Sequence, residues 1–496
     1  MSFLTQSKKT ELELYFNSFR QEIIGIDQHF NSPYGRKKIV YTDWTASGRL
    51  YGPIEERMAS VFGPFVANTH TETSVTGTTM TLAYREARRI IKKHVNANEN
   101  DVLIATGTGM TGAINKFQRI LGLKVPERLR DFVSIEESDR PVVFVSHMEH
   151  HSNQTSWLET IAKVVVIPCD EKGLFCLNNL KILLEKYKSN KLKIASITSC
   201  SNVTGITLPY QEVAQLMHQN DGLCFVDFAC SAPYIQIDMH PDNSDSYLDA
   251  IFVSPHKFLG GPGSSGILIF NKKLYKNLIP DCPGGGTVTW TNPWGGHQYI
   301  KDIEEREDGG TPGFLQVIRA SLVMNLKEKM GISNILKREK ELMSYFFKRM
   351  KSHSNISILA SEHEHRLGVI ALNVGSLHYN LVVKILNDRF GIQSRGGCSC
   401  AGTYGHYLLG IDEDKSKEIV SKVESGTCDY KPGWVRLSIH PTTTNSEMEF
   451  VCDSLIALAD NFEEWKKDYV FLNNKFQHLS EVSHPSKVMK DSWFEF

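Results

Sequence analysis

Long hydrophobic runs and a strong net charge are both missing from this sequence. No stretch of its 496 residues reaches the ~18 consecutive apolar residues that cross a bilayer. The formal net charge is only −1, which argues against a broad nucleic-acid or membrane surface. The N-terminal stretch MSFLTQSKKTELELYFNSFRQEII is charged throughout and lacks an apolar signal-peptide segment. We therefore expect a cytoplasmic protein without a membrane or nucleic-acid partner.

Closely spaced cysteines are scarce as well. The chain has 10 cysteines, and most of them stand alone, some inside apolar runs, as Cys200 and Cys224 do. In a chain of this length, such usage fits reduced thiols better than a disulfide framework. The exception is the stretch Cys398-Ser-Cys400, in which two thiols stand one residue apart.

Apolar runs alternate with helical patterns between about residues 80 and 270. Strand-like runs lie at 101–106, 142–146, 164–167, 194–198, 223–227 and 250–254. Strands separated by helices form a mostly parallel sheet that helices cover on both faces. From about residue 315 the pattern changes to long charged helices, followed by strand-like runs at 365–374 and 434–439. The sequence therefore predicts an α/β fold with a smaller α+β domain at its C-terminal end.

The length predicts one large and one small domain. We expect an N-terminal helical segment at 1–40 that packs with the small domain, and a large domain at 41–314. The small domain is expected at 315–470, followed by a tail at 471–496. The polar segments 126–140 and 411–432 are expected to be surface insertions.

Polar residues follow nearly every predicted strand. They are Gly107–Thr111, His147–His151, Ser199–Asn202, Asp227 and His256–Lys257. In a parallel sheet, ligands bind beyond the carboxyl ends of the strands, so these groups should line one site. A lysine desolvated by packing can attack a carbonyl as a free amine. A lysine that holds pyridoxal phosphate (PLP) also needs a carboxylate for the ring nitrogen, a platform for the ring, and donors for the phosphate.

Each of these groups also has a plainer interpretation. Asp227 can simply cap a turn, and Gly107–Thr111 can be ordinary turn chemistry rather than an anion site at a helix N-terminus. The pair His150-His151 can stack on a ring or bind a metal. No cysteine or histidine accompanies that pair at zinc spacing, so we expect no metal site.

Taken together, the motifs resemble those of the class V aminotransferase superfamily of fold-type I PLP enzymes. Within it, the sequence is similar to the cysteine desulfurase and selenocysteine lyase branch, from about Tyr41 to Ile456. The stretches that carry the resemblance are SPHKFLGGPGSSGIL, VDFACSAP, CSNVTGITLP, MEHHSN and GTGMTGAIN. The resemblance implies that the chain is a PLP-dependent enzyme acting on an amino acid.

The resemblance also implies roles for individual residues. Lys257 would be the catalytic Schiff-base lysine, Asp227 the partner of the pyridine nitrogen, and Asn202 a contact of the ring hydroxyl. His150 would stack on the ring and move protons. The phosphate would be held by Thr111, Ser254, His256 and the Gly109–Met110 backbone.

Three further stretches resemble family segments around the active site. ANTHTE would supply an active-site histidine, His70, as a substrate-binding residue. CPGGGTVTW and EEREDGGTPG would bring Thr287 and Thr311 towards the phosphate of a second subunit. The resemblance therefore implies a homodimer with shared active sites.

The stretch GIQSRGGCSCAGTYGH bears on the reaction. Arg395 precedes Cys400 by five residues, the spacing of the desulfurase branch, and Arg436 in VRLSIHP would grip the substrate carboxylate. The implied reaction converts L-cysteine to L-alanine and leaves a persulfide on Cys400, which requires a thiolate. A sulfur-acceptor protein is then a further expected partner.

Several alternatives stay open. Cys398 and Cys400 can be two small residues in a tight loop, and Cys398 can resolve a persulfide, form a disulfide or have no chemical role. The branch usually has a glutamine where this chain has Cys230, and small or polar residues at Trp44 and Thr45. The chain can thus be a class V aminotransferase, an epimerase or another C–S lyase in which Cys400 is not a nucleophile. It can also be a non-catalytic PLP-binding protein.

Overall fold

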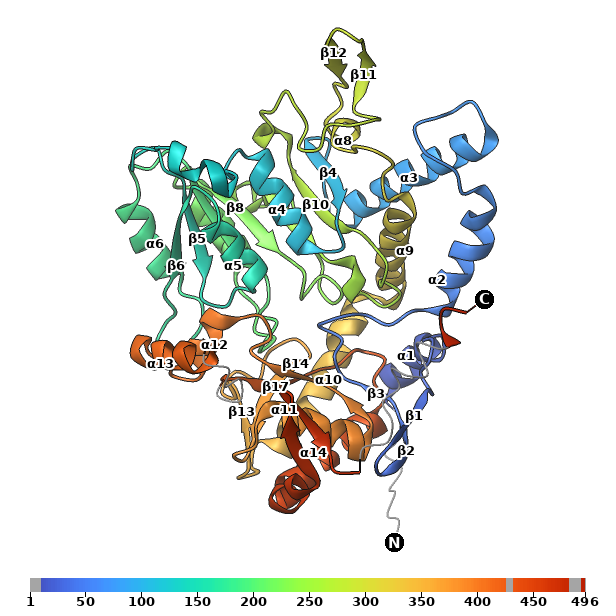
Figure 1. Ribbon diagram of the computed structural model, residues 1–496, viewed down its shortest axis with the longest axis vertical. Coiled ribbons are helices and arrows are strands. Elements are labelled where there is room, and N and C mark those ends of the chain that lie inside the picture. Colours follow the sequence, from blue (N-terminus) through green and yellow to red (C-terminus); the bar gives the residue numbers. More distant parts are fainter. Residues whose placement is uncertain (1–9, 425–430, 481–491, 496) are drawn as a thin grey trace.

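The structure is a computed structural model that describes residues 10–424, 431–480 and 492–495. Figure 1 shows two bodies, a large one around an extended sheet and a smaller one below it. The chain first contributes to the lower body, then builds the upper one, and returns to the lower body through long helices.

A seven-stranded sheet forms the centre of the large body, in the order β4-β10-β9-β8-β7-β5-β6. Its strands are β4 (Asp101–Thr106), β5 (Val142–Ser146), β6 (Lys163–Ile167), β7 (Lys193–Thr198), β8 (Leu223–Asp227), β9 (Ala250–Val253) and β10 (Gly266–Asn271). Strands β5 to β9 run parallel, whereas β10 is antiparallel to both β4 and β9. The expected mostly parallel sheet is therefore confirmed, and the antiparallel strand β10 is an addition to it.

Helices cover both faces of this sheet, which is why every residue of its strands β5, β7 and β9 is buried. Val143 and Val145 pack with the residues of α4 (Met110–Ile120) and α5 (His151–Leu158). Their neighbours Val142 and Phe144 belong to the core of the opposite face. That core includes residues of α3 (Val75–His94), α6 (Leu177–Lys186), α7 (Tyr210–His218) and α9 (Phe314–Met330).

The small body is built on a four-stranded antiparallel sheet, in the order β13-β14-β17-β16. Its strands are β13 (Ile356–Ile358), β14 (Val369–Val374), β16 (Arg395–Gly397) and β17 (Trp434–Ser438). Residues of α10 (Ile332–Met350), α11 (Tyr379–Ile385) and α14 (Asn445–Trp465) form its core. A capping box between Thr444 and Glu447 begins α14.

The N-terminal segment contacts both bodies. Helix α1 (Glu11–Gln21) places Phe16 and Phe19 in the core of the large body, while Arg20 pairs with Glu447 of α14 at 2.5 Å. The hairpin of β1 (His29–Ser32) and β2 (Gly35–Lys38) follows. Then β3 (Val40–Tyr41) pairs with β15 (Ile392–Gln393). The domain boundaries expected from the sequence stay a prediction.

Short elements complete the fold. Of the two expected insertions, 126–140 is mostly exposed, and 411–432 contains α13 (Glu413–Glu424), of which no residue is buried. The expected tail includes part of a hairpin of β18 (Tyr469–Leu472) and β19 (Lys475–His478). Residues 425–430, 481–491 and 496 lie outside the described ranges. The other elements are α2 (Gly52–Arg57), α8 (Ile303–Arg306), α12 (Gly402–Leu408), β11 (Val288–Thr291) and β12 (His297–Tyr299).

In Figure 1 the β11–β12 hairpin projects from the top of the large body. Within the described ranges, none of the helices has both the length and the apolar character needed to span a membrane.

A close backbone approach joins the segment after β3 to the turn that carries Lys257. The Gly48 N–H donates to the His256 carbonyl at 2.9 Å. A Cβ atom at Gly48 would lie 1.8 Å from the carbonyl oxygen of Phe258, so only glycine fits there. This contact brings residues 43–46 to the edge of the sheet where the site lies.

Candidate functional site

A cavity of about 270 Å³ lies between the carboxyl ends of the large sheet and the small body. The residues from the sequence analysis that line it are Met110, Thr111, His150, Asn202, Asp227, Ser254, His256, Lys257, Arg395, Cys400 and Arg436. Strands β7, β8 and β9 are neighbours and run parallel, so the segments that follow them meet at one edge. The small body supplies the two arginines and the Cys400 loop from β16 and β17.

Lys257 lies on a short 3-10 turn, Pro255–Lys257, directly after β9. Its backbone N–H donates to the Ser254 carbonyl at 3.0 Å, which fixes the start of the side chain. Burial lowers the pKa of the Lys257 amine, an effect that Cys230 and Asp227 oppose. A lowered pKa increases the fraction of neutral amine, the form that attacks a carbonyl carbon.

Asp227 is the last residue of β8 and is only 3% exposed. Its Oδ1 atom accepts a hydrogen bond from the Ala229 N–H at 2.8 Å. Burial raises the pKa of the Asp227 carboxyl to about 6, against the opposing effects of the Ala229 N–H and of Lys257. A buried carboxylate of this kind gains most from a cationic N–H partner, such as a protonated ring nitrogen.

The N-terminus of α4 forms the other end of the cavity. The Met110 N–H donates to Ser254 Oγ at 2.9 Å, and Thr111 Oγ1 lies 2.6 Å from Ser152 Oγ. His256 Nδ1 donates to the Thr108 carbonyl at 2.7 Å. Backbone N–H groups at a helix N-terminus, together with hydroxyl groups, suit a phosphate.

A glycine is required at this helix N-terminus. A Cβ atom on Gly109 would lie 2.8 Å from His256 Cε1 and 3.1 Å from Ser254 Oγ. The missing side chain therefore leaves room beside the groups that suit a phosphate.

His150 caps the N-terminus of α5 and faces the same cavity. Its Nδ1 atom accepts from the Ser152 N–H at 3.1 Å, which places the ring proton on Nε2. Burial, followed by the charge of Lys257, lowers the pKa of His150 to about 3. The imidazole is therefore neutral at physiological pH, and a neutral flat ring suits stacking on an aromatic ligand.

Asn202 has one amide atom bound and one without a partner. Its Nδ2 donates to the Ser399 carbonyl at 2.7 Å. Its Oδ1 is buried and has no hydrogen-bond partner among the described residues. Because an unsatisfied buried acceptor is costly, this atom is suited to receive a donor from a ligand, such as a ring hydroxyl.

Both arginines of the small body are held by one residue that the sequence analysis did not single out, Asp43. Arg436 Nη2 lies 2.8 Å from Asp43 Oδ1, and Arg395 Nε lies 3.0 Å from Asp43 Oδ2. The two arginines face each other across the β16–β17 pair. Asp43 directly precedes Trp44 and Thr45, but its two partners lie about 350 and 390 positions away, so no local pattern points to them.

Trp44 and Thr45, which follow Asp43, differ in whether they reach the cavity. Thr45 lines the cavity. Trp44 is buried and stacks on His440 with the ring centroids 4.2 Å apart, so it supports the wall rather than lining it.

The Cys398–Cys400 loop has an unusual backbone. Ser399 and Cys400 both have positive φ, 52° and 57°, which is uncommon for residues with a side chain. The loop is held by the His151 N–H, which donates to the Cys400 carbonyl at 2.7 Å, and by Asn202. Cys400 is exposed and lines the cavity, whereas Cys398 is half-buried and packs against a neighbouring core.

Three predicted site residues lie elsewhere, namely His70, Thr287 and Thr311. None of them lines the cavity of its own chain. His70 and Thr311 are exposed, and Thr287 Oγ1 donates to the Gly284 carbonyl at 2.6 Å. His70 comes close to the Gly284–Thr287 turn, since a Cβ atom on Gly286 would be 3.8 Å from His70 Cδ2. The Gly310 N–H donates to the Gly285 carbonyl at 2.8 Å, so Thr311 follows a residue that contacts the same turn. The three residues thus belong to neighbouring segments outside the cavity, and Thr287 itself is buried.

The residues of the cavity fit PLP. A carboxylate, a neutral histidine ring, an unpartnered amide oxygen, a helix N-terminus and a buried lysine are the groups that PLP requires. When bound, this cofactor draws electrons away from the Cα atom of an amino acid and stabilises negative charge there. Asp227, Asn202, His150 and the phosphate-binding groups would hold it next to Lys257.

We predict that Asp227→Asn stabilises the cofactor-free protein at pH 8 while weakening PLP binding. The folded-state pKa of about 6 lies above the unfolded value, so ionisation of Asp227 costs stability as pH rises through 6. The two values differ by ~2 units, which corresponds to roughly 3 kcal/mol at pH 8 and about half of that at pH 5. Urea unfolding at both pH values measures the difference. A variant that is less stable than the wild type at pH 8 contradicts the expectation.

We also predict that Asp43→Asn destabilises the protein by about 3 kcal/mol, because it leaves the buried Arg436 charge without its partner. The matched control is Glu72→Gln, which removes an ion pair with Arg85 in which both side chains are 54% exposed. This control is expected to cost less than ~1 kcal/mol. Denaturant unfolding measures both changes, and equal losses would show that Asp43 does not compensate a buried charge.

Known proteins share this fold and much of this sequence. The aminotransferase class-V family model matches residues 40–451. Proteins named probable cysteine desulfurase, from Halalkalibacterium halodurans and Staphylococcus aureus, are each 27% identical over 380 residues. The matched part is 76% of this chain and 86% and 85% of these two relatives.

Solved structures agree with this assignment at the level of the fold. A cysteine desulfurase from Thermococcus onnurineus has a TM-score of 0.71 at 21% identity and covers 90% of this chain and 98% of its own. A cysteine desulfurase from Escherichia coli has a TM-score of 0.68 at 21% identity, with coverages of 91% and 98%. The expected fold class is confirmed. The chain belongs to the class-V aminotransferase family and is a PLP-dependent enzyme of fold type I.

Proposed function

We propose that the protein is a cysteine desulfurase, which converts L-cysteine to L-alanine and leaves a persulfide on Cys400. The observation that carries this proposal is that Cys400, Lys257 and two arginines line one cavity. The names of the curated relatives, probable cysteine desulfurase, support the same activity.

The arginines provide the binding site for the substrate carboxylate. Asp43 neutralises one of the two positive charges, so the three side chains together carry a charge of +1. That charge matches a single carboxylate. Arg436 is fixed on both sides, because its Nη1 atom also donates to the Asn202 carbonyl at 3.2 Å. A carboxylate bound here would meet a guanidinium whose orientation is already set.

Proton transfer falls to Lys257 and His150. The lowered pKa of Lys257 allows its Nζ atom to take a proton from the Cα atom of the substrate and to return one later. Nε2 of His150 carries a proton that can hydrogen-bond to a group above the ring. With PLP bound, the Asp227 carboxylate would favour a proton on the ring nitrogen.

Sulfur transfer falls to Cys400. Its Sγ atom, as a thiolate, forms a bond with the substrate sulfur while the carbon–sulfur bond of the substrate breaks. The electron pair of that bond stays on the carbon, which takes a proton and becomes the methyl group of alanine. Arg395 lines the same cavity as Cys400. The persulfide is then passed to a thiol of an acceptor protein.

We predict that the wild-type protein releases alanine and sulfide from L-cysteine in the presence of reductant, and that Cys400→Ser lowers both by at least ~100-fold, because an alkoxide is not available at neutral pH. Cys282→Ser is the matched control, an exposed thiol outside the cavity, and should keep full activity. Chromatography of alanine and a colorimetric sulfide assay measure the products.

Two outcomes contradict the proposal. If no alanine and sulfide form, or if Cys400→Ser is as active as the wild type, then Cys400 is not the sulfur nucleophile. The chain then acts as an aminotransferase, an epimerase or another C–S lyase, and those activities are tested with other amino acids.

We further propose that the protein is a homodimer in which each subunit completes the other's site. His70, Thr287 and Thr311 support this arrangement, because they belong to neighbouring segments that lie outside the cavity of their own chain. Leu278 and Ile279 precede the Gly284–Thr287 turn in the sequence. Their apolar side chains are 83% and 60% exposed. The cytoplasmic location stays a prediction from the sequence.

We predict that heterodimers of Lys257→Ala and Thr311→Asp subunits are active although each homodimer is inactive. The carboxylate of Thr311→Asp would repel the phosphate of the partner, so the heterodimer keeps one intact site. Lys257→Ala combined with Asp227→Ala is the control, because both substitutions affect one cavity and no site is restored. Light scattering confirms the dimer. An inactive Lys257→Ala and Thr311→Asp heterodimer contradicts the shared site.

A further inference from the structure

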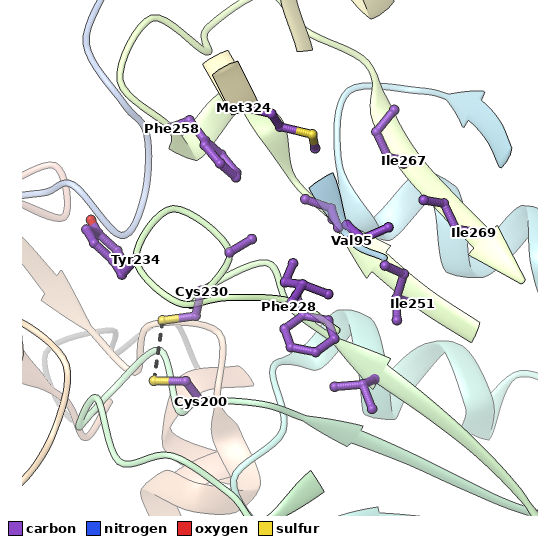
Figure 2. Packing of buried hydrophobic residues seen from close by; sticks show 14 of the residues in the cluster. Val95, Cys200, Phe228, Cys230, Tyr234, Ile251, Phe258, Ile267, Ile269 and Met324 are labelled. Atoms are coloured by element: carbon purple, nitrogen blue, oxygen red, sulfur yellow. Dashed lines mark hydrogen bonds between the residues drawn. The ribbon is translucent and has the colours of Figure 1, made fainter. Parts of the chain in front are cut away.

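Two thiols that the proposed reaction does not use lie side by side in the cofactor cavity. Cys200 follows β7 and Cys230 follows β8, and Figure 2 shows their sulfur atoms pointing at each other. The two Sγ atoms are 4.0 Å apart. Cys200 is 0% and Cys230 is 4% exposed, and both line the cavity that contains Lys257.

The pairing follows from the sheet. Strands β7 and β8 are parallel neighbours, with Thr198 opposite Asp227, so the chain segments that follow them stay adjacent. The two sulfur atoms are already neighbours at 4.0 Å, and a disulfide requires them to approach to ~2.05 Å.

The surroundings give the two thiols different characters. Both compete for one acceptor, the Ser201 carbonyl, at 3.6 Å from Cys200 Sγ and 3.8 Å from Cys230 Sγ. Burial raises the pKa of the Cys200 thiol. The hydrogen bond with Cys200 lowers the pKa of Cys230, and the charges of Lys257 and Arg436 act in the same direction. Cys230 is therefore the more nucleophilic sulfur, and Cys200 is the neighbour within reach of it.

We propose that Cys200 and Cys230 form an oxidisable dithiol, which hydrogen peroxide converts to a disulfide inside the cofactor cavity. Peroxide is small and uncharged, so it fits a cavity of about 270 Å³. The site is separate from Cys398 and Cys400 and does not depend on which amino acid the enzyme uses.

The chemistry takes two balanced steps. In the first, the Cys230 sulfur attacks one peroxide oxygen, the O–O bond breaks, and sulfenic acid and water form. In the second, the Cys200 sulfur attacks the Cys230 sulfur, the S–O bond breaks, and the disulfide and a second water form. The two thiols lose two electrons and two protons, and one peroxide molecule accepts them. A dithiol reductant reverses the reaction.

A disulfide here would change the environment of Lys257. Of the neighbouring groups that raise the pKa of Lys257, Cys230 has the largest effect. A disulfide carries no charge, so its formation removes this effect and leaves Asp227 as the acidic neighbour. The cavity would then differ in electrostatics as well as in shape between the reduced and the oxidised protein.

Peptide mapping of the full-length protein tests the proposal. The PLP-loaded protein, with Cys398 and Cys400 replaced by serine to remove their own oxidation, is treated with hydrogen peroxide. It is then denatured with a thiol-blocking reagent present. Cleavage after lysine alone leaves Cys200 and Cys230 on one peptide, so a second protease that cuts after Glu212 is needed to separate them.

The expected result is a cross-linked pair of peptides that contain Cys200 and Cys230, and that dithiothreitol separates. Cys200→Ala and Cys230→Ala should each abolish the cross-link. Cys224→Ala should keep it, since Cys224 is a buried thiol of β8 outside the pair. The protein with intact Cys200 and Cys230 gives a direct answer even if a variant fails to fold.

Two results overturn the proposal. In the first, the thiol-blocking reagent modifies both Cys200 and Cys230 after peroxide treatment, so no disulfide has formed, in PLP-loaded and in cofactor-free protein alike. The other is a cross-link that survives Cys200→Ala or that requires Cys224.

Discussion

Burial of charge at the carboxyl edge of the large sheet is the constraint on which the site depends. Lys257, Asp227 and Arg436 each lose water in the folded chain, and each can bear that loss only beside a group of opposite charge or a hydrogen-bond partner. The pKa shifts of Lys257 and Asp227 show that the protein alone does not fully compensate these two groups. The site is therefore prepared for a ligand that brings a cationic ring nitrogen, a phosphate and a carboxylate.

The two bodies of the molecule contribute different groups to this site. The large sheet supplies the groups that suit the cofactor, because parallel strands end together and a helix begins where the phosphate belongs. The small body supplies Arg395, Arg436 and the Cys400 loop, which suit the substrate. Asp43 comes from neither sheet. It is carried by the segment after β3 and joins the two arginines in one cluster.

The sequence was sufficient for the part of the site that follows the strands. Asp227 and Lys257 come at fixed positions after apolar runs, and the geometry of a parallel sheet then places them together. Asp43 was missed because an ion pair across hundreds of residues leaves no local pattern. Strand β10 was not among the predicted strands, and its antiparallel direction was not predictable, since an apolar run can show that a strand exists but not which way it runs.

His70, Thr287 and Thr311 show the other limit. A motif identifies such residues by likeness, but in the structure of the single chain they lie outside the cavity. The contact of Cys200 with Cys230 was not predicted either, although the sequence analysis named both residues. Their neighbourhood is set by the register of β7 and β8, which pairs Thr198 with Asp227 and which composition does not encode.

The loop of Cys400 has a consequence for motion. Its two anchors cross between the bodies: His151 and Asn202 belong to the large one, while the carbonyl groups of Cys400 and Ser399 belong to the small one. Any separation of the bodies must break both hydrogen bonds at once and release two left-handed residues from the geometry that those bonds support. The position of the Cys400 sulfur and the separation of the two bodies are therefore coupled. The sulfur keeps its place in the cavity only while the two bodies stay together.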